Sequence, residues 1–224
     1  MTSYNKNTFE LILLFLLTTI SFFVWDSILF FPIKLFVLLL HEISHGIIAI
    51  ITGGKILALE INFNLGGKCI TEDGNQFLIA FAGYPGSFFF GAALFFSTYK
   101  PKLKIFILSI IAVIVFLFAI NTMNDNLLSF ISIIIAFSIF AINKFAPVHI
   151  ANFIFRVIGL ISCVYVIYDI KEDVFNNNNY LSDASLIAEI TGLSSTFWGL
   201  LWIFISLIGI ILLVTFSVRN HKLY

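Results

Sequence analysis

The stretch IKLFVLLLHEISHGIIAIIT, from Ile33 to Thr52, decides how this part of the chain must fold. It is long and apolar enough to cross a bilayer as a helix, since about 20 such residues span the hydrocarbon core. Three ionisable residues, His41, Glu42 and His45, interrupt the run. Such groups are costly in hydrocarbon, so they usually face the interior of a helix bundle and serve a function. The stretch therefore predicts a membrane-spanning helix that carries a polar site.

The spacing of the three ionisable residues is typical of a metal site. His41 and His45 are separated by one helical turn and therefore share one face of the helix. Two neutral imidazoles in this arrangement can bind one Zn²⁺, with Glu42 placed to accept a proton from a water molecule at the metal. The alternative is a pair of buried histidines that only make hydrogen bonds. We favour zinc, because the HExxH pattern rarely arises by chance in a chain with four histidines.

The composition indicates a polytopic membrane protein. Of its 224 residues, 60% are hydrophobic and only 11% are charged, and the mean hydropathy is +1.07. A soluble domain carries about a quarter charged residues. We therefore expect an all-α bundle in the lipid bilayer, forming a single domain over residues 1–224, with multi-pass insertion into the cell (plasma) membrane. The formal net charge of zero and the lack of a basic stripe argue against nucleic acid as a partner, and the oligomeric state is left open.

Apolar length predicts six to seven transmembrane helices, with Pro32 separating the first two. The predicted spans are Leu11–Phe31, Ile33–Thr52, Phe77–Ser97, Leu103–Ile120, Leu127–Ile142, Val148–Tyr168 and Phe197–Val218. Their alternation places the lysines at 100–104, Lys144 and Arg219 on one side, which the positive-inside rule predicts to be cytoplasmic. The long loops 53–76 and 169–196 then lie on the opposite side.

The loop 53–76 has the alternation of a β-strand followed by Gly66-Gly67, which suits a turn. A short β-hairpin is therefore expected within Ile56–Ile70, and an extended substrate could pair with its edge. An irregular interhelical loop is the alternative. The alternating residues are Leu57, Leu59, Ile61 and Phe63.

Catalytic zinc needs three protein ligands, so one more donor must come from outside the HExxH segment. Asp169 closes the sixth predicted span, and Asp183 precedes a short helix predicted at Ala184–Ile190. The topology places both carboxylates on the side where the HExxH helix ends. One could ligate zinc while the other orients an imidazole. Alternatively, Asp183 caps its helix and Asp169 is a solvated carboxylate at the membrane interface.

The segment Ala82–Ser87 is rich in small residues and contains Pro85. Small residues let membrane helices approach closely, so we interpret the segment as a packing surface. A helix that is loosened by Gly and Pro and lines the path of a substrate is the alternative.

Taken together, these segments resemble the M50B-like membrane metallopeptidases, which are relatives of the site-2 proteases. The resemblance extends from about Leu39 to Leu207. It implies a zinc-dependent intramembrane protease that cleaves a membrane protein or peptide, with His41 and His45 as ligands and Glu42 as the catalytic base. Site-2 proteases take their third ligand from an LDG motif, which this chain lacks, so Asp169 and Asp183 are the substitutes. The resembling segments are His41–Gly46, Thr52–Gly54, Ala82–Ser87, Asp169-Ile170, Ser182–Ala184 and Trp198–Trp202.

Two other functions are compatible with the sequence. One is a non-catalytic membrane scaffold or chaperone that retains a metal site, although such a site would have no use for Glu42 as a base. The other is a transporter or metal permease, which would need polar residues in several spans and a repeat that we do not find.

Overall fold

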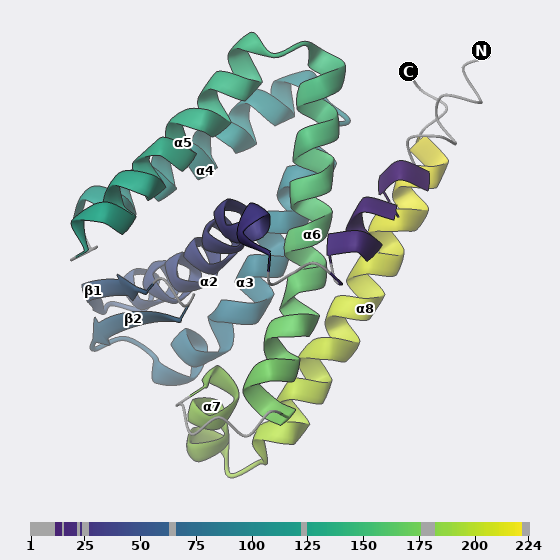
Figure 1. Cartoon of the computed structure of the whole chain (residues 1–224). Coiled ribbons are helices and arrows are strands. Elements are labelled where there is room, and N and C mark those ends of the chain that lie inside the picture. The colour runs from purple at the N-terminus through teal and green to yellow at the C-terminus, as the bar shows by residue number, and fades with distance from the viewer. Residues whose placement is uncertain are drawn as a thin grey trace.

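The computed structural model describes residues 12–14, 16–21, 23, 27–62, 66–121, 125–175 and 182–220 of the chain. Within these residues, helices form a bundle and one small sheet lies beside it (Figure 1). The elements are η1 (Ile28–Phe30), α2 (Phe31–Ile51), β1 (Lys55–Ile61), β2 (Gly67–Glu72), α3 (Gln76–Ser97), α4 (Pro101–Asn121), α5 (Asn126–Phe145), α6 (Val148–Phe175), α7 (Asp183–Thr191) and α8 (Ser195–Asn220).

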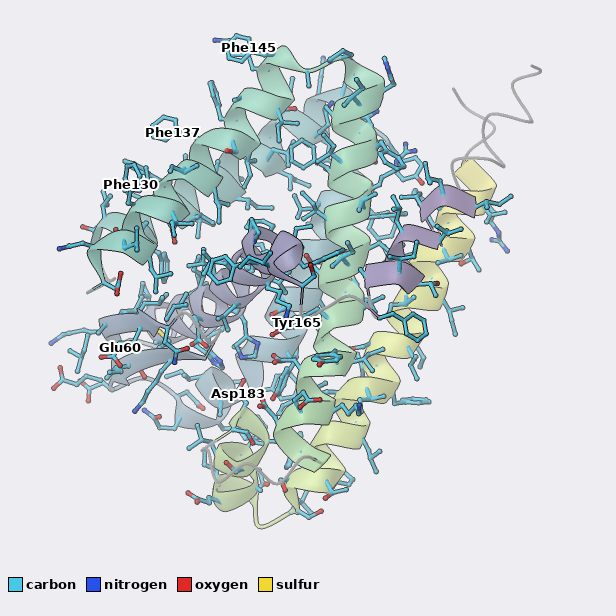
Figure 2. All side chains as sticks on the ribbon, in the orientation of Figure 1. Glu60, Phe130, Phe137, Phe145, Tyr165 and Asp183 are labelled. Carbon is cyan, nitrogen blue, oxygen red and sulfur yellow. The ribbon has the colours of Figure 1, made fainter. Side chains whose placement is uncertain are left out.

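Six described helices are long and apolar enough to cross a membrane, which makes the chain a multi-pass membrane protein. They coincide with six of the seven predicted spans. The remaining predicted span, Leu11–Phe31, lies partly outside the described residues. Among the residues of this span that are described, a shorter apolar helix is found within Ile12–Ser21. Large apolar side chains on the outer faces suit contact with lipid, as Phe130, Phe137 and Phe145 on α5 illustrate (Figure 2).

Helix α2 lies inside the bundle, and α3 packs against both α2 and α6. Glycine makes the contact of α3 with α6 possible. A Cβ atom on Gly159 would lie 2.6 Å from the carbonyl oxygen of Gly91, so a side chain there would push the helices apart. The α4–α5 pair and α8 pack at opposite sides of this centre (Figure 1).

The predicted hairpin is confirmed as an antiparallel pair in which Leu59 lies opposite Cys69. An irregularity between Ile56 and Ala58 interrupts the alternation of β1. As a result Leu57 is exposed, whereas Leu59 and Ile61 are buried in the core beside α2. Phe63, the fourth residue of the predicted alternation, lies outside the described residues.

The predicted short helix is also confirmed, as α7 at the end of the bundle that carries the hairpin (Figure 1). Ser182 caps its N-terminus by accepting a hydrogen bond from the Ser185 amide. Gly192 ends it with a φ of +74°, a left-handed conformation that favours glycine. Helix α6 continues to Phe175, so Asp169 lies within a helix and not at its end as predicted.

Candidate metal centre

Two imidazoles on α2 and one carboxylate on α7 converge at a buried point. The Nε2 atoms of His41 and His45 lie 3.0 Å and 3.1 Å from the same oxygen, Oδ2 of Asp183. The centroids of the two imidazole rings are 4.9 Å apart, and both histidines are buried. The predicted spacing of one helical turn therefore does place both rings on one face, and Asp183 lies opposite them.

The orientation of His45 is fixed from its far side. Its Nδ1 lies 2.6 Å from the backbone carbonyl oxygen of Ile79 on α3. A carbonyl only accepts hydrogen bonds, so we assign the ring proton to Nδ1. This leaves the lone pair of Nε2 directed toward Asp183, which is the tautomer that a metal ligand needs.

Asp183 is the first residue of α7, directly after the cap. Because the Ser182 hydroxyl caps the helix, the Asp183 carboxylate is not used for capping. Its side chain is 13% exposed. Burial alone would raise the pKa of Asp183, but the neighbouring His45 and His41 outweigh it and hold that pKa below its usual range. An ionised carboxylate is the form that binds a metal ion.

Asp169 approaches the centre from another direction. Its Oδ2 lies 3.7 Å from Nδ1 of His41, the nitrogen that faces away from Asp183. Its Oδ1 accepts a hydrogen bond from the Tyr165 hydroxyl at 3.2 Å. Asp169 thus lies behind His41, and it is not among the three residues whose donor atoms converge.

The backbone of the hairpin lies against Glu42. A Cβ atom on Gly67 of β2 would collide with the Glu42 carboxylate, so a side chain there would displace Glu42 from its position. Burial and, to a lesser degree, the nearby Glu42 raise the pKa of the Cys69 thiol to about 12. This thiol is therefore protonated at neutral pH and is a poor nucleophile and metal ligand.

Helix α3 supplies the wall of the site through a glycine. A Cβ atom on Gly83 would lie 2.4 Å from both Asp183 Oδ2 and His41 Nε2. We interpreted the segment Ala82–Ser87 as a packing surface, and Gly86 does contact Ser44 closely in this way. Gly83 has a second role that the composition did not reveal, because it leaves open the space around the donor atoms.

Tyr84 and Asp173 also lie beside the site, and neither was predicted from the sequence as a site residue. The Tyr84 ring packs edge-to-face against His41, with 5.1 Å between the ring centroids, and its hydroxyl donates a hydrogen bond to Asp173. Asp173 lies one turn after Asp169 on α6, and this spacing of four residues is the only trace of the arrangement in the sequence.

The donor set fits a divalent cation of the zinc type. The three donor atoms lie within 4.8 Å of one another. Two ligand atoms about 2.0–2.2 Å from a tetrahedral ion are separated by 3.3–3.6 Å, close to the distances between the imidazoles and the carboxylate. The described residues provide three such donors in this group, which is the number found in catalytic zinc sites that keep a position for water.

Comparison with known proteins agrees with this geometry. The family model described as Peptidase M50B-like matches residues 13–213, which is most of the chain. No match was found among curated proteins or among solved structures.

Proposed function

The chain belongs to the Peptidase M50B-like family, and from this premise we propose that it is a zinc-dependent protease, acting as a single domain, that hydrolyses peptide bonds within or near the membrane. The observation that carries the proposal is the convergence of His41 Nε2, His45 Nε2 and Asp183 Oδ2, with Glu42 adjacent on the same helix. Asp183 is then the third ligand, and Asp169 orients His41 from behind.

A zinc ion held by His41, His45 and Asp183 would polarise the scissile carbonyl and lower the pKa of the attacking water. Glu42 accepts the proton of that water and passes it to the leaving nitrogen. The Glu42 side chain suits this role because it is buried and lies against the backbone of strand β2 at Gly67.

The hairpin is the element that we propose for presenting the substrate. A peptide must be extended before its carbonyl groups become accessible, since a helix holds them in hydrogen bonds. Strand β2 is part of a two-stranded sheet, so one of its edges has no partner strand within that sheet. A segment of a membrane protein or peptide that pairs with this edge would pass close to Glu42.

We place the protein in the cell (plasma) membrane, with the centre on the side opposite the basic residues. Lys100, Lys102 and Lys144 lie at the α3–α4 and α5–α6 connections, whereas the hairpin and α7 lie at the other end (Figure 1). The positive-inside rule makes the basic end cytoplasmic. Membrane fractionation and cysteine labelling from each side would test both statements.

The decisive experiment compares Glu42→Gln with Glu60→Gln in purified protein reconstituted in liposomes with fluorogenic single-span peptides. Glu42→Gln should keep its zinc, measured by elemental analysis, and lose cleavage by a factor of about 10²–10⁴. Glu60 is an exposed carboxylate on β1, the strand that does not form the proposed substrate edge, so Glu60→Gln should cleave like the parent. Equal cleavage by Glu42→Gln would refute the mechanism, and bound zinc without any cleavage by the parent would favour the scaffold.

A further inference from the structure

The imidazole of His41 is packed between two other rings. One of these rings is that of His45. The other is that of Tyr84 on α3, which contacts the His41 imidazole edge-to-face at an interplanar angle of 79°. Tyr84 is completely buried. Rotation of the His41 ring would therefore require the Tyr84 ring to move.

The Tyr84 ring is itself held by its hydroxyl group. That hydroxyl donates a hydrogen bond to Oδ2 of Asp173 on α6. One turn earlier on the same helix, Asp169 faces Nδ1 of His41. Two carboxylates on one face of α6 thus contact two neighbouring rings. Asp169 lies near the imidazole of His41, and Asp173 accepts the hydrogen bond of the Tyr84 phenol.

A purely structural role for this hydrogen bond, namely joining α3 to α6, is poorly supported. The two helices already meet through Gly91 and Gly159, where any side chain would collide with backbone atoms. The Tyr84 ring also packs in an apolar cluster with Trp202 and Ile170, and a phenylalanine would fill that space equally well. The hydroxyl adds little to helix packing, and its evident effect is to fix the ring beside His41.

We propose that Tyr84 and Asp173 are positioning residues for His41. They keep its Nε2 directed at the proposed metal site, which Asp183 also faces. The inference rests on the proposed metal site and deepens it. Loss of the Tyr84–Asp173 hydrogen bond lets the phenyl ring and the imidazole reorient, and metal affinity falls while the three ligands remain in place. Residues of this kind around metal ligands contribute about 10–100-fold in affinity or activity, and an indirect contact should lie at the lower end, near tenfold.

The test measures cobalt(II) binding to the purified full-length protein, with the visible spectrum as the report on coordination geometry. Tyr84→Phe should lower cobalt affinity about tenfold and change the spectrum. The matched control is Tyr99→Phe. Tyr99 lies two residues after the end of α3 and is buried, and its hydroxyl donates a hydrogen bond to Ser217 of α8, far from the metal site. This control should leave affinity and spectrum unchanged, even if both variants lose the same amount of thermal stability.

Two variants of Asp173 complete the test. Asp173→Ala should match Tyr84→Phe, and the double variant should be no worse than either alone, because both remove one interaction. Asp173→Asn still accepts a hydrogen bond from the Tyr84 hydroxyl and should restore most of the affinity. Unchanged cobalt spectra in Tyr84→Phe and Asp173→Ala, or additive losses in the double variant, would overturn the inference. Failure of the parent protein to bind cobalt would instead contradict the proposed metal site itself.

Discussion

Helix α2 and helix α7 both contribute to the centre, but they are very different elements. Helix α2 has 21 residues, and 78% of its most apolar stretch is buried. Helix α7 has nine residues, is no candidate for a membrane span, and depends on its cap and on packing of Ala184 and Ile187. The comparison teaches that one part of the centre is formed by local helix geometry, whereas the other exists only after α7 has docked.

The largest expected effect comes from removing a donor on either helix. If a binding free energy of about 10–16 kcal/mol is shared among the three protein ligands, His45→Ala or Asp183→Ala should each lower zinc affinity by about 10²–10⁴-fold. Titration against a chromogenic chelator measures this. Normal zinc binding by Asp183→Ala would mean that α7 contributes no ligand, and the comparison would fail.

A methyl group in the wall between the two helices should be nearly as damaging. Gly83→Ala places a carbon 2.4 Å from donor atoms of both α2 and α7, so we expect a loss of affinity of about 100-fold, like that of losing a ligand. Gly91→Ala is the control, because it collides with Gly159 on α6, away from the centre. It should lower the melting temperature without abolishing zinc binding.

Removing the metal should increase amide exchange in α7 much more than in α2. At a ligand concentration 100 times Kd, binding stabilises the docked state by about 2.7 kcal/mol, so chelation should speed amide exchange in residues 183–191 by up to 100-fold. Amides of residues 41–45 should change far less, because α2 is held by the core. Equal changes in both segments, measured by hydrogen–deuterium exchange, would show that α2 is not preformed.

Asp169 offers a smaller effect that distinguishes the two carboxylates. Asp169→Asn removes a negative charge 3.7 Å from His41 Nδ1 but no atom of the converging group, so zinc affinity should fall about 10–100-fold. An effect equal to that of Asp183→Asn would mean that the assignment of ligand and orienting residue is wrong.

The smallest effect should come from the cap of α7. Ser182→Ala removes the hydrogen bond to the Ser185 amide and should cost about 1 kcal/mol of helix stability. Because binding needs a docked α7, zinc affinity should fall by up to about fivefold. Ser194→Ala removes a similar hydrogen bond, to the Phe197 amide at the start of α8, and should leave zinc affinity unaffected.

Local rules explain why much of the fold was predictable. Apolar length found six spans, and strand alternation found the hairpin, since both depend on neighbours in sequence. The end of α6 was predicted too early, at Tyr168, because apolar length detects the hydrocarbon-facing part of a helix. The polar residues that follow, such as Lys171 and Glu172, continue the helix to Phe175.

Only the part of the site that lies on one helix was predictable from the sequence. The geometry of His41 and His45 follows from the helical repeat. Which of two carboxylates lies beside both imidazoles depends on how α6 and α7 dock, and no local pattern encodes that. Gly83 and Tyr84 were missed for the same reason, since their importance arises from contacts with α2 and α6.

The long separation of the donors along the chain has a consequence for biogenesis. His41 and Asp183 are 142 positions apart, and four membrane-spanning helices lie between them. During synthesis the two histidines emerge early, and the donor set stays incomplete until those helices have been made and α7 has docked. If the centre holds an ion as proposed, the ion is acquired late, and the nascent polypeptide has no hydrolytic activity while it is still being inserted into the lipid.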